Sequence, residues 1–410
     1  MNYKVKNIYG NTSDKKIPVS VPGSKSITAR ALLIAALSCG ESTLYGVQFS
    51  DDCATFLQCL KDLGIKCEVF GTTVKITGCG GKLEKSKAEI YVGSAGTAAR
   101  FLPAFLAFQN GRYTLTCSEQ MKKRPVSSLI KTLEELGAKF TFLEEKNSYP
   151  FIIEGTLSPK TEITVNIEES SQFLSALLIC GICANAPMTI KAEGRHSLGY
   201  VNMTLDMMWS FGVTAQEIEG GYRVCGGYTA KKYEIEPDVS AACYFYAANK
   251  ILGTNLCVNG LMPRSMQGDI KFIKLLQDFD GGTVDCSPFS DQALTLAAIA
   301  PYFKNPTKIC NVAHIRKQEC DRIKAMVENL TAMGVKVEEF ADGVKIYPSL
   351  PKPAKIKTFG DHRVAMSFAV SGLRADGIEI ENAEVCSKTF KDFFTVLDGI
   401  CNEYPDNKQA

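Results

Sequence analysis

The sequence predicts an α/β protein with two domains, and two observations carry that prediction. The chain has 410 residues, of which 45% are hydrophobic and 22% are charged, an ordinary composition for a globular protein with room for two domains. The second observation is a recurring unit, in which an amphipathic helix ending in Leu-Gly or a similar pair is followed by two short strands. The units recur roughly every 70 residues, longer than the period of a solenoid repeat, so each copy is a supersecondary α/β unit.

Four segments carry the complete pattern, and a fifth carries a degraded copy. They are Leu60–Gly64 to Val74–Gly78, Leu133–Gly137 to Phe151–Gly155, Met207–Gly212 to Tyr222–Gly226, Leu330–Gly334 to Val344–Pro348, and the degraded Leu275–Gly282. Glycine after a helix end is the usual left-handed cap, and the segments that follow alternate as half-buried strands do. A glycine pair ahead of a polar run predicts a domain boundary near Gly227–Lys232.

Charge and cysteine content bound the class of protein. The formal net charge of +2 gives no reason to expect nucleic acid or an anionic membrane as the main partner. No apolar run reaches the roughly 18 residues of a membrane span, and Met1–Asn11 does not resemble a signal peptide. The 16 cysteines are scattered and suit reduced thiols in a cytoplasmic protein. One Cys-X-X-Cys pair, Cys180 and Cys183, lies in an apolar stretch, so buried packing is favoured over zinc binding.

The segment from Val21 to Arg30 reads VPGSKSITAR and predicts an anion site at the start of a helix. Ser24 can cap the helix, and Lys25 and Ser26 fall in its first turn, where free N–H groups and the macrodipole favour an anion. Arg30 lies one turn further along the same face as Ser26. A phosphate or carboxylate is the expected ligand, and the alternative is an ordinary capped helix with solvated charges. The spacing does not match a Walker loop.

Six predicted helices open on a small or polar cluster. The clusters are Gly23–Ser26, Gly93–Thr97, Glu169–Gln172, Asp238–Ser240, Ser290–Asp291 and Gly360–Arg363. Each one alone is an N-cap signal. Because several are followed by arginine or lysine on the same face, together they predict helix N-termini that converge on a highly anionic ligand. The alternative is that all six are only caps.

Four arginines in short polar motifs suit a clamp for carboxylate or phosphate groups, since a guanidinium can bind such a group through two hydrogen bonds. They are Arg100, Arg124, Arg322 and Arg363. Several such arginines in one cleft would indicate a substrate with more than one anionic group. Lys25 and Lys388 would add cations that tune neighbouring carboxyl groups for proton transfer.

Two carboxylates are the best candidates for general acid or base chemistry. Glu319 comes just before a predicted helix over Ile323–Met333 and is expected to share a face with the arginine three residues later. Asp291 opens a second predicted helix, over Gln292–Ala300. His362 is a weaker candidate.

Taken together, these residues closely resemble the 5-enolpyruvylshikimate-3-phosphate synthases, the family of 3-phosphoshikimate 1-carboxyvinyltransferases that glyphosate inhibits. The motifs PGSKS…R, GTAxR, MxxRP, SSQF, SxxY, SMQGD, ECDR and GDHRxAM occur in family order between Pro18 and Phe394. The resemblance implies a two-domain inside-out α/β barrel, each domain of three βαβαββ repeats, with helix N-termini facing the interdomain cleft that holds the active site. It implies a first domain of residues 1–18 plus 228–410 and a second domain of residues 19–227.

The resemblance also implies two small-molecule substrates and the residues that bind them. Shikimate 3-phosphate would contact Lys25, Ser26, Arg30, Ser170, Ser171, Gln172, Ser197, Tyr200, Asp291 and Gln318. Phosphoenolpyruvate would contact Lys25, Gly96, Arg124, Gln172, Arg322, Arg363 and Lys388.

The reaction that the resemblance implies is an addition followed by an elimination. Asp291 would take the proton of the shikimate 5-hydroxyl, whose oxygen attacks C2 of phosphoenolpyruvate as C3 is protonated. Glu319 and Lys25 would take part in the proton transfer, and phosphate leaves the tetrahedral intermediate. Cationic side chains stabilise the charge, so neither a metal nor an organic cofactor is expected. The expected protein is a cytoplasmic monomer without nucleic-acid or membrane partners.

Five residues depart from the family pattern. Ser94 and His314 each stand where many members have Asn. Gln120 replaces a usual Arg, and Phe101 replaces a common Pro. Gln318 occupies the position of a lysine that usually helps to bind shikimate 3-phosphate. These departures concern the acceptor, while the residues expected for enolpyruvyl transfer are present.

Two other functions are the alternatives. One is enolpyruvyl transfer to another acceptor such as UDP-N-acetylglucosamine, whose enzyme carries a reactive cysteine between Arg and Pro where this chain has Lys123-Arg124-Pro125. The adjacent serines Ser170 and Ser171 also suit a phosphate better than a sugar nucleotide. The other is a catalytically silent member of the family that acts as a binding module. Against it stands the presence of every catalytic side chain that the resemblance implies.

Overall fold

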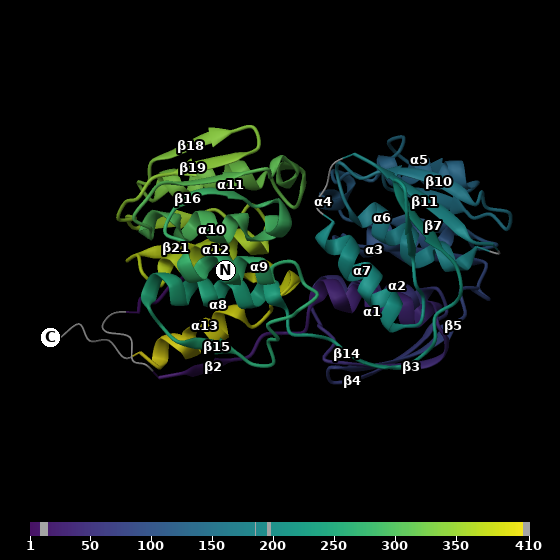
Figure 1. The fold of residues 1–410 in the computed structure, drawn as a ribbon, viewed down its shortest axis with the longest axis horizontal. Helices are drawn as coiled ribbons and strands as arrows, with labels where there is room; N and C mark the ends of the chain where they lie inside the picture. The colour runs from purple at the N-terminus through teal and green to yellow at the C-terminus, as the bar shows by residue number, and fades with distance from the viewer. Residues whose placement is uncertain (9–14, 185, 195–197, 405–410) are drawn as a thin grey trace. The chain divides into compact units, whose positions relative to one another are not determined.

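The computed structural model describes residues 1–8, 15–184, 186–194 and 198–404, and it divides the chain into two compact units (Figure 1). Unit 1 comprises residues 1–22 and 237–410, and unit 2 comprises residues 23–236. Both boundaries lie later in the chain than the sequence predicts, and strand pairing gives the reason. Strand β2 (Ile17–Val19) pairs with β15 (Leu256–Val258) of unit 1, while β14 (Lys232–Glu234) pairs with β3 (Cys39–Tyr45) of unit 2.

Unit 2 contains three four-stranded sheets, in the orders β14-β3-β5-β4, β6-β7-β9-β8 and β10-β11-β13-β12. Its helices are α1 (Lys25–Leu37), α2 (Asp51–Asp62), α3 (Ala98–Leu106), α4 (Glu119–Lys122), α5 (Ser127–Leu136), α6 (Gln172–Cys180) and α7 (Gly199–Ser210). Its other strands are β4 (Lys66–Phe70), β5 (Thr73–Cys79), β6 (Lys87–Tyr91), β7 (Arg112–Thr116), β8 (Lys139–Phe142), β9 (Phe151–Glu154), β10 (Glu162–Asn166), β11 (Met188–Glu193), β12 (Gln216–Ile218) and β13 (Gly221–Val224).

Each sheet of unit 2 combines a parallel pair of strands with an antiparallel hairpin. In the second sheet β6 and β7 are parallel, and β9 joins β7 in antiparallel register, with Ile90 opposite Leu115 and Leu115 opposite Phe151. These three residues are buried, so the register aligns one apolar face across the sheet. The third sheet repeats this order, and in the first sheet β14 supplies the strand beside β3 from the far end of the unit.

Three helices form the interior of unit 2. Every residue of α3 is buried, as is every residue of α1 after Ser26 and of α6 after Gln172. Helices α3 and α6 pack against each other, and α7 packs against both α1 and α6. A helix that is apolar on all sides must lie in a core, and these helices do. Their N-termini carry the polar clusters that the sequence singles out.

Unit 1 contains the sheets β16-β17-β19-β18, β1-β21-β20 and β15-β2. Its helices are α8 (Val239–Leu252), α9 (Ile270–Asp278), α10 (Ala293–Ile299), α11 (Arg322–Ala332), α12 (His362–Gly372) and α13 (Phe393–Asn402). Its other strands are β1 (Tyr3–Lys4), β16 (Gly282–Asp285), β17 (Thr307–Cys310), β18 (Val337–Phe340), β19 (Gly343–Ile346), β20 (Ala354–Ile356) and β21 (Ile378–Ile380).

Helices α8, α10 and α12 pack against one another in the core of unit 1, and α11 packs against β18 and β19 (Figure 1). All residues of α10 are buried, and α12 is buried apart from Arg363. The polar N-terminal ends of α10, α11 and α12 are where the candidate site of this unit is built.

The repeated unit predicted from the sequence is confirmed in its local structure. Each complete copy is a helix followed by an antiparallel strand pair: α2 with β4–β5, α5 with β8–β9, α7 with β12–β13 and α11 with β18–β19. Helix α5 ends on Gly137 with φ 117°, the left-handed cap that its sequence predicts. The degraded copy is the end of α9 followed by the single strand β16.

Candidate active site

Arg322 is the centre of a charged cluster in unit 1. It is the first residue of α11, which Asp321 caps, and its side chain is 1% exposed. Its Nε donates to Asp361 Oδ2 at 2.8 Å, its Nη1 to Asp291 Oδ1 at 2.9 Å, and its Nη2 to Glu319 Oε2 at 2.8 Å. Burial lowers the pKa of this guanidinium, but the three carboxylates outweigh burial and raise the pKa above its usual value. Arg322 is therefore a permanent cation that orients three carboxylates.

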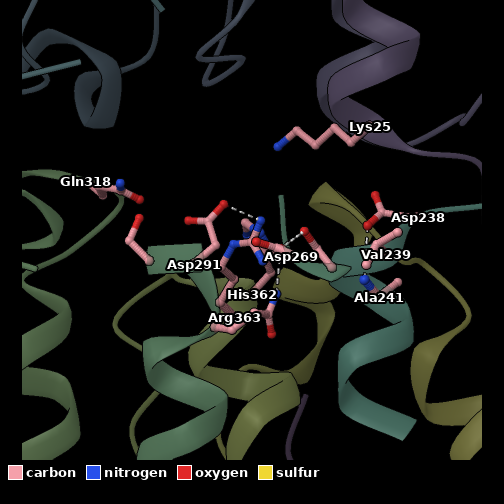
Figure 2. Close-up of polar contacts among 12 residues, drawn as sticks. Lys25, Asp238, Val239, Ala241, Asp269, Asp291, Gln318, His362 and Arg363 are labelled. Atoms are coloured by element: carbon pink, nitrogen blue, oxygen red, sulfur yellow. Dashed lines mark hydrogen bonds and ion pairs between the residues drawn. The ribbon is translucent and has the colours of Figure 1, made fainter. Parts of the chain in front are cut away.

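Asp291 lies between two arginines. Its Oδ2 accepts a hydrogen bond from Arg363 Nη2 at 2.8 Å, a contact that Figure 2 shows, while its Oδ1 accepts from Arg322. The Asp291 side chain is 15% exposed, so the carboxylate is held in place yet open to solvent on one side. Such a carboxylate is oriented for contact with a bound molecule.

The helix that follows Asp291 is shorter than the sequence predicts. The expected helix covers Gln292–Ala300, but α10 begins at Ala293, and Ser287–Gln292 forms a 3-10 segment before it. Phe289 has non-helical φ and ψ of −144° and 47°, so the chain kinks there instead of continuing one helix. The kink places Asp291 in the turn that leads into α10.

Glu319 lies before α11 and not on the helix itself. The predicted contact with Arg322 is nevertheless made, since the two residues are three apart in the chain and Arg322 is the first residue of the helix. Lys388 Nζ lies 3.6 Å from Glu319 Oε1, and both side chains are less than 10% exposed. Glu319 and Lys388, which the sequence predicts to share a site, therefore lie together beside Arg322.

Asp361 is a member of this cluster that sequence reasoning missed. It is fully buried, caps α12 by accepting from Arg363 N at 2.8 Å, and binds Arg322 Nε through its other oxygen. The GDHR motif pointed to a helix start, and an N-cap Asp is the signal that was available. The sequence could not show that the same carboxylate pairs with an arginine of another helix.

Asp269, the last residue of the SMQGD motif, is a second carboxylate that was not among the predicted site residues. It is buried at the start of α9, and its Oδ2 accepts hydrogen bonds from Ser240 Oγ and, at 2.8 Å, from Gln292 Nε2. Burial and the nearby charge of Asp291 raise its pKa to about 6, against the lowering effects of Arg363 and the two hydrogen bonds. Figure 2 shows Asp269 beside the Asp291–Arg363 pair.

Two residues that depart from the family pattern contact this cluster or its neighbour. Gln318 Oε1 accepts from Arg322 Nη1 at 2.5 Å, so the amide oxygen is directed at the central arginine. His314 Nε2 lies 3.0 Å from the hydroxyl of Ser290, the residue before Asp291. Gln318 and His314 are therefore placed beside the proposed proton acceptor.

In unit 2 the N-terminus of α1 has the predicted form. Ser24 caps the helix, with its Oγ 3.4 Å from Ile27 N, and Lys25 is the first helical residue. Lys25 Nζ lies 2.6 Å from Asp52 Oδ2, on α2, and Asp52 is 5% exposed. The sequence did not identify Asp52, because only the packing of α1 on α2 brings the two residues together.

Arg30 is a buried cation, and its side chain is held by neutral groups. Its Nε donates to Thr204 Oγ1 at 2.7 Å, its Nη1 to Ser26 O at 3.0 Å, and its Nη2 to Tyr200 O at 3.1 Å and Ser175 Oγ at 3.4 Å. Burial lowers the pKa of this guanidinium to about 10. A cation buried among neutral partners is stabilised by a bound anion, which supports the predicted anion site.

Gly96 and Arg124 are in close contact. A Cβ added at Gly96 would lie 3.0 Å from Arg124 Nη1, so only glycine leaves this guanidinium where it is. Arg100 donates to Gly96 O at 3.3 Å and to Pro125 O at 2.7 Å and is 2% exposed. Arg100 therefore braces the two segments that carry Gly96 and Arg124, whereas Arg124 is partly exposed.

The serine cluster lies at the start of α6. Ser170 Oγ accepts from Gln172 N at 3.2 Å, and Ser171 is the buried N-cap residue. Tyr200 lies in the first turn of α7, with its ring centroid 5.8 Å from Arg30 Cζ. Ser197 lies outside the described residues.

The structure gathers the predicted residues into local sets. In unit 1 one set comprises Asp291, Gln318, Glu319, Arg322, Arg363 and Lys388. In unit 2, Arg30 contacts Ser26 and Tyr200, and Gly96 contacts Arg124. Within the described ranges no group of three or more His, Cys, Asp or Glu side chains could hold a metal ion, and no helix is long and apolar enough to cross a membrane. These sets are suited to bind anions and to transfer protons.

An α/β fold with clustered arginines and oriented carboxylates defines the class: a protein whose site is built for multiply anionic small molecules. A family model described as EPSP synthase (3-phosphoshikimate 1-carboxyvinyltransferase) matches residues 12–285 and 276–397. The chain belongs to this family.

Curated relatives and solved structures agree with this assignment. The chain is 41% identical over 402 residues to a 3-phosphoshikimate 1-carboxyvinyltransferase of Trichormus variabilis, covering 92% of this chain and 94% of the relative. It is 37% identical over 409 residues to a 3-phosphoshikimate 1-carboxyvinyltransferase 2 of Halalkalibacterium halodurans, covering 93% and 91%. A solved EPSP synthase of Acinetobacter baumannii superposes with a TM-score of 0.81 at 23% identity, covering 97% of this chain and 98% of that one, which shows a shared fold.

Proposed function

We propose that the protein transfers the enolpyruvyl group of phosphoenolpyruvate to the 5-hydroxyl of shikimate 3-phosphate and releases phosphate, a step of the shikimate pathway. The single observation that carries the proposal is the bridge that Asp291 makes between Arg322 and Arg363, in a chain whose relatives bear the name of this reaction. A carboxylate so oriented is suited to accept the hydroxyl proton.

The residues of unit 2 are assigned mainly to the acceptor. Arg30 is proposed to hold shikimate 3-phosphate, because its buried charge has only neutral partners among the described contacts, namely Ser26, Thr204, Ser175 and Tyr200. The other proposed contacts are Lys25, Ser26, Ser170, Ser171, Gln172, Ser197 and Tyr200. Helix N-termini and serine hydroxyls donate hydrogen bonds to phosphate oxygens, which is the chemistry that this set supplies.

The residues assigned to phosphoenolpyruvate come from several elements: Lys25, Gly96, Arg124, Gln172, Arg322, Arg363 and Lys388. Arg322 has five N–H donors, and the described contacts with Asp361, Asp291, Gln318 and Glu319 use four of them. Its proposed part is therefore mainly to hold the carboxylates, with one N–H left for substrate. Arg363 and Lys388 would supply more of the charge that stabilises the departing phosphate.

The proton transfers are assigned to three residues. Asp291 accepts the proton of the 5-hydroxyl, the oxygen attacks C2, and C3 receives a proton as the tetrahedral intermediate forms. Glu319 and Lys25 take part in that proton transfer, a role that the contacts of Glu319 with Arg322 and Lys388 support. Phosphate then leaves C2 as C3 gives up a proton, which restores the C2–C3 double bond, and the acceptor oxygen stays bonded to C2.

We also propose that each unit is an inside-out α/β barrel, with sheets around a helical interior. The buried helices α1, α3 and α6 of unit 2 support this arrangement, as does the mutual packing of α8, α10 and α12 in unit 1. The helix–strand order of three of the four-stranded sheets matches the βαβαββ repeat.

The test is phosphate release from phosphoenolpyruvate by the purified full chain. Release that depends on shikimate 3-phosphate and that yields the enolpyruvyl ether, identified by mass spectrometry, is the expected result. Release with UDP-N-acetylglucosamine instead would assign the sister reaction. No release with either acceptor, from a protein that still binds phosphoenolpyruvate, would assign a binding function.

A further inference from the structure

Two cysteines face each other across the first sheet of unit 2. Strand β3 begins at Cys39 and β5 ends at Cys79, and the antiparallel register sets these two residues directly opposite each other. Both are free thiols, Cys39 exposed and Cys79 partly exposed. Neither residue has a part in the proposed reaction.

The hydrogen bonds around Cys39 and Cys79 show which kind of antiparallel residue pair the two cysteines form. Gly80 N donates to Ser38 O, so Ser38 and Gly80 form a hydrogen-bonded pair, and the next pair along, Cys39 with Cys79, is a non-hydrogen-bonded one. The backbone groups of Cys39 point away from β5: its N–H donates to Tyr228 O, and its C=O accepts from Ala230 N. In a non-hydrogen-bonded pair the Cα atoms lie about 4.5 Å apart, within the range of roughly 4.4–6.8 Å that a disulfide spans.

The two side chains also leave the sheet on the same face. Ser42 and Leu44 of β3 are buried, as are Val74 and Ile76 of β5, so by strand alternation Cys39 and Cys79 lie on the opposite, outer face. Cys39 Sγ would lie 3.1 Å from a Cβ added at Gly80, so this sulfur is close to the residue that follows Cys79. The thiols therefore need side-chain rotation, and no strand movement, to meet.

We propose that Cys39 and Cys79 are a reactive dithiol that a hydroperoxide converts to an intrachain disulfide. The exposed Cys39 thiolate attacks a peroxide oxygen, so an S–O bond forms, the O–O bond breaks, and water leaves after protonation. The Cys79 thiolate then attacks the Cys39 sulfur of the sulfenic acid, forming the S–S bond and releasing the second water. The two thiols lose two electrons and two protons, and one hydrogen peroxide is reduced to two waters.

A neighbouring thiol and a second thiol pair provide contrasts. Cys183 Sγ would lie 3.4 Å from a Cβ added at Gly81, so it is near Cys79, but burial raises the pKa of Cys183 far above that of an ordinary thiol. Cys286 and Cys310 also lie on neighbouring strand ends, where Cys286 N donates to Cys310 O, but Cys286 is fully buried. Burial also raises the pKa of the Cys79 thiol, so it is the exposure of Cys39 that favours the Cys39–Cys79 pair over both.

The experiment treats the full chain with stoichiometric hydrogen peroxide, alkylates the remaining thiols, and maps the tryptic peptides by tandem mass spectrometry. Cleavage at Lys75 and Lys82 isolates Cys79 as the single cysteine of its peptide, while the peptide with Cys39 extends from Ala31 to Lys61. The expected product links these two peptides, is lighter than their sum by two hydrogen atoms, and disappears on treatment with dithiothreitol.

Three variants make the result specific. Cys39→Ser and Cys79→Ser should each abolish the crosslink. In Cys39→Ser the peptide from Ala31 to Lys61 still carries Cys53 and Cys59, so a crosslink that survives in this variant would show that Cys53 or Cys59 is the partner of Cys79. The matched control Cys310→Ser should retain the crosslink at the wild-type yield. Equal turnover of reduced Cys39→Ser and wild type would show that the variant is folded.

Two other outcomes would overturn the proposal. One is oxidation of Cys39 to sulfinic or sulfonic acid while Cys79 is recovered as a free thiol. The other is a Cys286–Cys310 disulfide formed as readily as the Cys39–Cys79 disulfide.

Discussion

Replacement of Asp291 by asparagine tests the proposed proton acceptor and the charged cluster together. In the wild type each carboxylate oxygen accepts from a different arginine, Oδ1 from Arg322 and Oδ2 from Arg363. A carboxamide has the same shape but one oxygen, and its NH2 group cannot accept. One arginine N–H therefore loses its acceptor, and two cations lose their shared counter-charge.

The expected loss of turnover is large, and the expected loss of stability is moderate. Removal of a general base lowers rate by about 10²–10⁴-fold. A hydrogen bond to a charged group contributes about 1.5–3 kcal/mol, and the lower end applies to Asp291, since the side chain is 15% exposed and Arg322 keeps Asp361 and Glu319 as partners. Unit 1 should then unfold about 3–6 °C lower, at about 2–4 °C per kcal/mol for domains of this size.

The assay is phosphate release under saturating phosphoenolpyruvate and shikimate 3-phosphate, together with a thermal unfolding curve. Asp321→Asn is the matched control, because Asp321 also pairs with an arginine, Arg316 at 3.0 Å, but lies outside the cluster around Asp291. Asparagine also caps helices well, so this variant should keep near-wild-type turnover and stability. Turnover of Asp291→Asn within a few-fold of the control would refute the role of Asp291 as the proton acceptor.

Three further variants test other parts of the site. Gly96→Ala should raise the Michaelis constant for phosphoenolpyruvate and weaken glyphosate inhibition, since its methyl group would lie 3.0 Å from Arg124 Nη1; unchanged inhibition would remove Gly96 from that pocket. Gln318→Lys should lower the Michaelis constant for shikimate 3-phosphate about five-fold at low salt, because a charge-assisted bond exceeds a neutral one by roughly 1 kcal/mol. Gln318→Met is its control, because it removes the acceptor of Arg322 without adding charge, and a raised constant in the lysine variant alone would show repulsion by neighbouring cations. Asp269→Asn tests the raised pKa of Asp269, about 6. Because folding favours the protonated carboxyl, the stability of the wild type relative to the variant should fall as pH rises from about 4 through 6. A stability difference that stays flat or rises over this range would contradict the raised pKa.

Much of the local structure follows from the sequence, because its causes are local. Ser24 and Asp361 cap helices where small polar residues precede apolar runs, and Gly137 ends α5 in the left-handed conformation. The contact between Glu319 and Arg322 follows from three residues of separation at a helix start. The order of helices and hairpins in the repeated unit follows from the same short-range signals.

Long-range pairing was decided only by the tertiary structure. Asp52 meets Lys25 because α1 packs on α2, and Asp361 meets Arg322 because the starts of α11 and α12 lie together, contacts that no spacing in the chain encodes. The second domain boundary lies later in the chain than predicted for a similar reason. Strand β14 is short and polar, and it belongs to unit 2 only through its pairing with β3.

The sequence by itself determined which chemical groups are present and where helices present them: a lysine, a serine and an arginine at the start of α1, and an aspartate in the turn before α10. The tertiary structure decided which groups neutralise one another. Arg30 is buried among neutral hydrogen-bond partners, whereas Arg322, equally buried, is surrounded by three carboxylates. Both are arginines near a helix N-terminus, and the physical difference between them is negative charge within 3 Å of the guanidinium, of which Glu319 is local and Asp291 and Asp361 come from distant segments.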